Sequence, residues 1–135
     1  MTFTPAAKKT IYDFLCDTKT KPEDYDLILT GDLGQIGTEL LRELLMKESQ
    51  IDISGVHNDC GLMIFDREKQ DVHAGGSGCG CSASVLCSKI LNGMRRGEYK
   101  NIMFVATGAL LSGISSLQGE SIPGIAHGII IRSEV

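Results

Sequence analysis

The sequence predicts an α/β fold: a layered, mixed but mostly parallel sheet with helices on both faces. Short β-rich runs alternate along the chain with longer segments whose apolar residues recur every three or four positions. Two of the short runs, Tyr25–Thr30 and Asn101–Ala106, are apolar throughout their centres, as in strands covered on both sides. Alternating strands and helices imply such a layered arrangement.

Length and composition favour one ordinary globular domain, spanning residues 1–135. The net charge of −4 argues against general nucleic-acid binding and provides no basic patch for a membrane. Five cysteines without disulfide-scaffold spacing indicate a reducing compartment. No apolar run is long enough to span a bilayer, and we expect no signal peptide because Met1 leads into a capped amphipathic segment.

The first elements follow from their capping residues and periodicity. Thr4 and Pro5 are typical of a helix N-cap and first helical position, which predicts a helix over Thr4–Asp17. The strand Tyr25–Thr30 ends at Gly31-Asp32, and Asp32 is expected to cap the next helix. That helix carries one apolar stripe, made of Ile36, Leu40, Leu41, Leu44 and Leu45.

Glycines at positions 31, 34 and 37 do not have the spacing of a dinucleotide fingerprint. No phosphate-binding lysine follows them, so a nucleotide-binding loop is excluded.

The second half of the chain contains the remaining strands. The last two are expected to pair antiparallel because no helix separates them. Strands are expected at Leu62–Phe65, Asn101–Ala106 and Ile125–Arg132, and a further one is expected to begin at Val72. Ile51–His57 is expected to be extended or irregular, and Leu110–Ser121 to be a loop.

A glycine-rich turn followed by a small-residue helix stands out in the middle of the chain. Four glycines occupy six positions from Gly75 to Gly80, and Cys79 and Cys81 lie in the same segment. A helix is predicted because apolar residues recur at the helical period, namely Ala83, Leu86, Cys87, Ile90 and Met94. Because many of its side chains are small, this helix is expected to be buried on several sides. Its first turn would suit an anionic or carbonyl ligand, whereas a tight turn with close packing is the alternative.

Ligands of such folds bind at the carboxyl ends of the strands. Three loops are expected there: Gly31-Asp32, Gly75–Ser82 and Ala106-Thr107-Gly108. The candidate ligand-binding residues are Gly78, Cys79, Gly80, Cys81, Ser82, Thr107, Gly108 and His127.

Several motifs resemble the carboxyl-terminal half of the stage V sporulation protein AD family. The motifs are YDLILTGD (25–32), HNDCG (57–61), AGGSGCGCSA (74–83), ATGALLS (106–112) and IPGIAH (122–127). The resemblance covers nearly the whole chain. It implies a thiolase-like fold of two similar halves, of which residues 1–135 are the carboxyl-terminal one and the amino-terminal half is absent.

The resemblance also implies a function. It makes the chain a sporulation protein that binds dipicolinic acid and assists its uptake into the developing spore. The expected partners are dipicolinic acid and other stage V sporulation A membrane proteins. The expected location is the forespore or spore, as a soluble protein peripherally associated with the inner membrane.

The wider thiolase and ketoacyl synthase superfamily places its acylated cysteine on the amino-terminal half. Its usual acid/base residues in the other half would fall where this chain has Gly31-Asp32, Gly78–Cys81 and Ala106–Gly108. This comparison favours binding without catalysis. The alternatives are half of an acyl-transfer enzyme, or a structural subunit of the spore membrane channel assembly.

The cysteines and histidines have competing interpretations. Cys79 and Cys81 form a C-x-C pair, which is weak evidence for zinc or redox chemistry, so no metal or cofactor is expected. Cys16, Cys60 and Cys87 are expected to be small core residues. The loop residue His57 is interpreted either as a ligand contact or as part of a hydrogen-bonded loop. His127 is expected to be buried on a strand face, and Arg42 to be solvated.

Self-association is also expected. The resemblance places the small-residue helix in a layer shared by the two halves. Leaving the apolar side of Ala83–Met94 uncovered would expose a patch of the kind that monomers avoid. The chain is therefore predicted to form a homodimer or higher oligomer.

Overall fold

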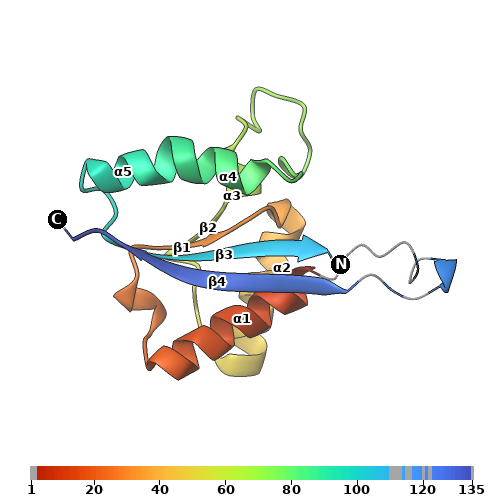
Figure 1. Ribbon diagram of the computed structural model, residues 1–135, viewed down its shortest axis with the longest axis horizontal. Helices are drawn as coiled ribbons and strands as arrows, with labels where there is room; N and C mark the ends of the chain where they lie inside the picture. Colours follow the sequence, from red (N-terminus) through yellow and green to blue (C-terminus); the bar gives the residue numbers. More distant parts are fainter. Residues whose placement is uncertain (1–2, 110–113, 115–116, 120, 122, 135) are drawn as a thin grey trace.

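The protein folds around one four-stranded sheet with helices on both faces (Figure 1). The computed structural model describes residues 3–109, 114, 117–119, 121 and 123–134. The strands are β1 (Leu27–Thr30), β2 (His57–Asp59), β3 (Asn101–Ala109) and β4 (Gly124–Arg132), in the order β2-β1-β3-β4. β1 is parallel to β2 and β3, and β4 is antiparallel to β3. The predicted fold class and the antiparallel final pair are both confirmed.

The helices form two layers. Helices α1 and α2 pack on one face of the sheet, and α4, η2 and α5 follow one another as a single rod over the other face (Figure 1). No helix in the described part of the chain is long and apolar enough to cross a membrane. The helical segments are α1 (Phe3–Thr18), η1 (Pro22–Asp24), α2 (Gly34–Ser49), α3 (Cys60–Met63), α4 (Cys81–Val85), the π-helical η2 (Leu86–Ile90) and α5 (Leu91–Arg95).

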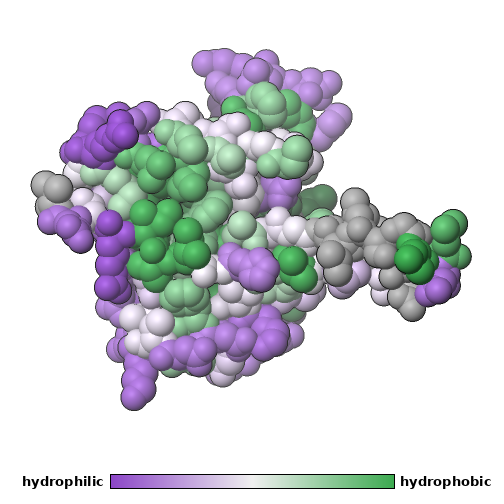
Figure 2. All heavy atoms as spheres, viewed as in Figure 1, coloured by the Kyte–Doolittle hydropathy of each residue, from purple (hydrophilic) through white to green (hydrophobic). Residues whose placement is uncertain are grey.

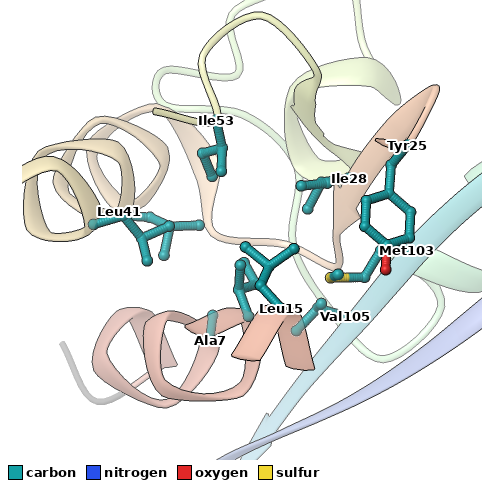
Figure 3. Packing of buried hydrophobic residues seen from close by; sticks show 10 residues of the cluster. Ala7, Leu15, Tyr25, Ile28, Leu41, Ile53, Met103 and Val105 are labelled. Carbon is teal, nitrogen blue, oxygen red and sulfur yellow. The ribbon is translucent and has the colours of Figure 1, made fainter. Parts of the chain in front are cut away.

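The alternation of side chains along the strands divides the interior into two apolar clusters. Ile28, Met103 and Val105 face α1 and α2, where they meet Leu15 and Leu41 (Figure 3). The intervening residues of the same strands face the other layer. That second cluster combines Leu27, Leu29, Ile102 and Phe104 with Cys60, Cys81, Val85, Ile90 and Met94. Both central strands therefore bury side chains on both faces, as their continuous apolar runs predict.

The small-residue helix is buried along one side only, which corrects the expectation of burial on several sides. Val85, Ile90 and Met94 face the sheet and are buried. Ala83 and Cys87 lie on the opposite side and are exposed. The π-helical segment inserts between α4 and α5, and wider winding there shifts which residues face the sheet. The expected core residues Cys16 and Cys87 are likewise both exposed, whereas Cys60 is buried.

Two predicted strands are wrong. Residues 62–63 belong to the helix α3, residues 64–65 form a bend, and no strand begins at Val72. The third parallel strand is instead His57–Asp59, which has too few residues and too polar a composition to give a strand pattern. Pairing with β1 makes it a strand. In α2, Ile36 is 59% exposed and is not part of the buried stripe. Most of the predicted loop at 110–121 lies outside the described residues.

β4 forms an open edge of the sheet. Alternate residues of β4 face the layer of α4 and α5, but Ile125, His127 and Ile129 remain exposed. The expectation that His127 is buried is therefore wrong, because the helical rod does not extend over this part of the edge strand.

The orientation of the small-residue helix gives a stability test. We expect Ile90→Ala to lower the free energy of unfolding by about 2–5 kcal/mol, because it removes a fully buried side chain. Cys87→Ala on the exposed side of the same rod should change it by less than about 0.5 kcal/mol. Urea unfolding followed by circular dichroism measures both. A larger cost for Cys87→Ala than for Ile90→Ala would mean that the helix faces the sheet differently.

Candidate functional site

A cavity lies where the carboxyl ends of β1 and β3 meet the beginning of α4. Its volume is about 510 Å³, and its lining combines backbone, hydroxyl, thiol, carboxylate and aromatic groups. Residues from four separate parts of the chain contribute. They are Phe3, Asp32, Gly78, Cys79, Ser82, Thr107 and Gly108. The position agrees with the general placement of ligand sites at strand carboxyl ends in α/β folds.

Close backbone contacts hold the glycine-rich turn against α3. The N–H of Gly76 donates to the carbonyl of Gly61 at 2.7 Å. Gly75 has φ = +124°, and a Cβ there would lie 2.4 Å from the same carbonyl oxygen. Any side chain at position 75 would therefore clash with backbone atoms, so glycine is required for this approach.

Asp32 connects the turn to β3. Its carboxylate accepts a hydrogen bond from the Thr107 hydroxyl at 3.1 Å and one from the Gly78 N–H at 3.3 Å. The side chain therefore bridges two walls of the cavity. The expected helix-capping role of Asp32 is wrong, because the first N–H groups of α2 donate to a different carboxylate.

The start of α4 presents backbone donors beside the cavity. The N–H of Cys81 donates to Gly78 and that of Ser84 to Gly80, at 3.1 and 2.9 Å. Ser82 and Ala83 lie in the same first turn, where N–H groups have no carbonyl partner within the helix. The N–H groups of Ser82 and Ala83, together with the Ser82 hydroxyl, can bind a ligand that carries carboxylate or carbonyl oxygens.

The two buried cysteines are structural. The Cys81 sulfur lies 3.9 Å from the carbonyl oxygens of Gly31 and Gly76. Burial raises the pKa of the Cys81 thiol, and the nearby carboxylates of Asp32 and Asp59 raise it further. Burial likewise raises the pKa of Cys60 to about 12. A reactive thiolate needs a lowered pKa, so neither residue fits redox or nucleophilic chemistry.

The structure brings together part of the predicted site. Gly78, Cys79, Ser82, Thr107 and Gly108 line the cavity. Gly80 and Cys81 lie next to it in the chain without lining it. His127 lines a separate hollow between β4 and α1. Thr107 and Gly108 belong to β3 and not to a turn, since the strand continues to Ala109. The aromatic wall, Phe3, was missed because only the tertiary fold brings the N-terminus to this place.

A buried carboxylate organises the loops below the cavity. Asp59 is fully buried and accepts the Thr30 hydroxyl at 2.5 Å. It also accepts the N–H groups of Leu33, Gly34 and Gly61 at 3.0, 3.0 and 3.1 Å. One side chain thus satisfies the first donors of both α2 and α3. Burial raises the pKa of Asp59, and these four hydrogen bonds act in the opposite direction. The HNDCG motif contained this residue, but no sequence spacing indicated its partners.

His57 belongs to the same network, which supports its hydrogen-bonded interpretation. Thr30 gives its only hydroxyl proton to Asp59, so His57 Nε2 donates to Thr30 Oγ1 at 3.0 Å. Arg42 Nε donates to His57 Nδ1 at 3.2 Å, and the Arg42 guanidinium also donates to the His57 carbonyl. Burial, and then the Arg42 charge, lower the pKa of His57 to about 3. The expectation that Arg42 is only solvated is therefore wrong.

Among the described residues, no group of three histidine, cysteine, aspartate or glutamate side chains could hold a metal ion. The cavity instead offers hydroxyls, backbone donors and an aromatic ring. The fold and this lining define a class of protein: an α/β domain with a cavity at the carboxyl ends of its parallel strands.

Sequence comparison identifies the family within that class. The sequence pattern of stage V sporulation protein AD (SpoVAD) matches residues 1–132. The chain is 46% identical over 128 residues to the stage V sporulation protein AD of Bacillus subtilis (strain 168). The match covers 95% of the chain and 37% of that relative's length. The chain belongs to the SpoVAD family of sporulation proteins.

The buried, neutral His57 gives a pH test. Below pH 6.5 the unfolded chain takes up a proton on this residue, whereas the folded chain does not until about pH 3. The stabilisation is therefore complete above pH 6.5 and falls as the pH drops, by at most about 1.4 kcal/mol per pH unit. We expect His57→Gln to reduce the slope of unfolding free energy against pH between pH 6.5 and 5. Denaturant unfolding at several pH values measures the slope.

Asp59 contributes a pH dependence of opposite sign, because its pKa is raised in the folded chain. The informative quantity is therefore the difference in slope between the original chain and His57→Gln, and not the slope of either protein alone. His73→Gln is the matched control, since His73 is exposed. An equal effect of both substitutions would contradict the assignment to His57.

Proposed function

We propose that the chain is a non-catalytic sporulation protein whose cavity binds dipicolinic acid. The observation that carries the proposal is the gathering of Ser82, Thr107 and the start of α4 around one 510 Å³ cavity. Membership of the SpoVAD family supports the role in sporulation. The chemistry of the lining supports a small, planar ligand that has carboxylate groups.

The proposed binding mode uses three kinds of contact. One carboxylate accepts hydrogen bonds from the first-turn N–H groups of α4 and from the Ser82 hydroxyl. The Phe3 ring, which also lines the cavity, offers an apolar face to the pyridine ring. The Thr107 hydroxyl also lines the cavity, and in this mode it turns its proton from Asp32 to the second carboxylate.

Asp32 opposes a dianionic ligand at one point of the cavity. Its two oxygens already accept from Thr107 and Gly78, which orients the negative charge between these groups. In the proposed mode one carboxylate lies at the α4 end, and the second lies near Thr107, where the neighbouring Asp32 charge repels it.

Assistance in uptake belongs to the whole protein, and the chain spans 37% of the length of its Bacillus subtilis relative. We propose that it acts in the forespore or spore, at the inner membrane surface, together with other stage V sporulation A membrane proteins. The thiolase-like two-half architecture is part of the same proposal. The four-stranded mixed sheet with helices on both faces is compatible with one such half.

Filling the cavity should weaken binding. We expect Ser82→Leu to weaken dipicolinate binding at least about tenfold, because the larger side chain occupies ligand volume and removes a hydroxyl. Ser88→Leu is the matched control, since Ser88 is exposed on the same helical rod and outside the cavity. Isothermal titration calorimetry at fixed pH and salt measures both. Unchanged affinity in Ser82→Leu would place the ligand elsewhere.

Removing the Asp32 charge should have the opposite effect. Asp32→Asn keeps an oxygen that can accept from Thr107, and it eliminates repulsion worth about 1 kcal/mol between charges a few ångströms apart in water. We expect dipicolinate to bind about fivefold more tightly at low salt, with the gain decreasing as salt is added. Pyridine-2-carboxylate, which has one carboxylate, should gain less. Weaker dipicolinate binding by Asp32→Asn would mean that this carboxylate contributes to recognition.

A further inference from the structure

β4 is a long edge strand without the features that usually prevent edge pairing. Its nine residues, GIAHGIIIR, contain no proline and no lysine, and their only charged residue is the last one, Arg132. One side pairs with β3 along the whole strand, and no other strand of the described sheet lies on its other side. In Figure 1, β4 runs along the near edge of the sheet between α1 and α5. Such an edge is a template for another strand.

An apolar patch accompanies this edge. Leu91, Ile125 and Ile129 are 36%, 42% and 53% exposed. Figure 2 shows a continuous hydrophobic area over β4 and the adjoining part of α5, between hydrophilic surfaces. Contiguous exposed apolar side chains of this kind mark interaction surfaces.

We propose that β4 pairs with β4 of a second copy of this chain, antiparallel about a two-fold axis at Gly128. The two sheets then join into one continuous sheet. This contact is isologous, so each copy contributes the same surface and the assembly closes as a dimer. The inference does not depend on what the cavity binds.

The apolar side chains support this register. With Gly128 opposite Gly128 of the second copy, Ile125 lies opposite Ile131 on the face toward α5. A hollow of about 360 Å³ lies there, lined by Leu91, Met94 and Ile131 among others. Ile125 of the second copy therefore meets a concave apolar surface. The two-fold symmetry produces this contact between Ile125 and the hollow twice, once at each end of the strand pair.

Charges on α1 support the same axis. A Cβ at Gly128 would lie 3.2 Å from Phe14 and 3.3 Å from Thr10, so the middle of α1 is level with the axis. Lys9 and Asp13 lie on either side of this level and are exposed, with 2.6 Å between Lys9 Nζ and Asp13 Oδ2. Lys9 also lines the hollow beside the β4 edge. The two-fold axis would place Lys9 of each copy near Asp13 of the other.

The structure favours this surface over the small-residue helix, where the sequence predicted association. Val85, Ile90 and Met94 of that helix are buried against the sheet, and the 36% exposed Leu91 belongs to the patch beside β4. Its exposed side carries Ser84, Ser88 and Asn92, whose side chains bond to the carbonyls of Gly80, Ser84 and Ser88, respectively. The exposed large apolar side chains therefore lie along β4 and beside it, and not on this side of the helix.

The first test changes one exposed isoleucine at a time. Ile129→Lys introduces the charge by which natural edge strands avoid pairing, and Ile36→Lys makes the same change at a 59% exposed position on α2. Sedimentation velocity of the 135-residue chain over a dilution series gives the dimer dissociation constant. We expect Ile129→Lys to raise it at least about tenfold and Ile36→Lys to leave it unchanged. Circular dichroism of each variant checks that the monomer remains folded.

The second test exploits the charge pair. Lys9→Glu leaves two acidic groups from each copy near the proposed axis, and Asp13→Lys leaves two basic groups from each copy. Each variant alone should dimerise more weakly than the original chain, whereas an equimolar mixture should form heterodimers, detected by native mass spectrometry. If Lys9 and Asp13 interact only within their own α1 helix, the mixture will not favour heterodimers over homodimers.

Three outcomes would overturn the proposal. The first is a chain that stays monomeric at high concentration. The second is a dimer that Ile129→Lys leaves unchanged; loss of that dimer with Ser84→Lys would move the contact to the helix. The third is an absence of heterodimer preference, which would contradict the axis at Gly128.

Discussion

The buried Asp59 carboxylate is the interaction on which the loops of this structure depend. It accepts four hydrogen bonds, from the Thr30 hydroxyl and from the N–H groups of Leu33, Gly34 and Gly61. These donors belong to the end of β1 and the beginnings of α2 and α3, so one side chain joins three elements at the same edge of the sheet. A buried carboxylate is tolerated only when it is satisfied in this way. Asp32 directly precedes Leu33, and its position between Thr107 and Gly78 therefore follows from the same anchor.

The sheet determines where the cavity lies. Alternating side chains on β1 and β3 fill both apolar layers, and this leaves the carboxyl ends of the strands as the place where the layers open. Helix α4 begins at that point because the glycine-rich turn can approach α3 at Gly61. Polar groups gather there because, where strands and helices end, backbone N–H and C=O groups lose their partners in regular secondary structure. The same sheet ends in the edge strand β4, so the cavity and the open edge belong to one sheet.

The cavity and the β4 edge are physically connected. Thr107 and Gly108, which line the cavity, pair with Ala126 and Ile125 of β4. The carbonyl of Ala126 accepts a hydrogen bond from the Thr10 hydroxyl of α1 at 2.8 Å. The pairing of β3 with β1 stops at Val105, so β4 is the strand that holds the end of β3. The two proposals are independent in their evidence but meet in this strand pair.

The sequence by itself determined the α/β class, the antiparallel final strands, and the glycine-rich turn and Thr107–Gly108 as parts of the candidate site. These depend on local patterns: apolar runs, glycine spacing and helical periodicity, which short-range physics sets. Only the tertiary structure decided that His57–Asp59 is a strand, that Asp59 caps two helices, and that Phe3 lines the cavity. Each of these depends on contacts between residues far apart in the chain. The side of the small-residue helix that is buried was decided in the same way, since only the sheet beneath it distinguishes Ile90 from Cys87.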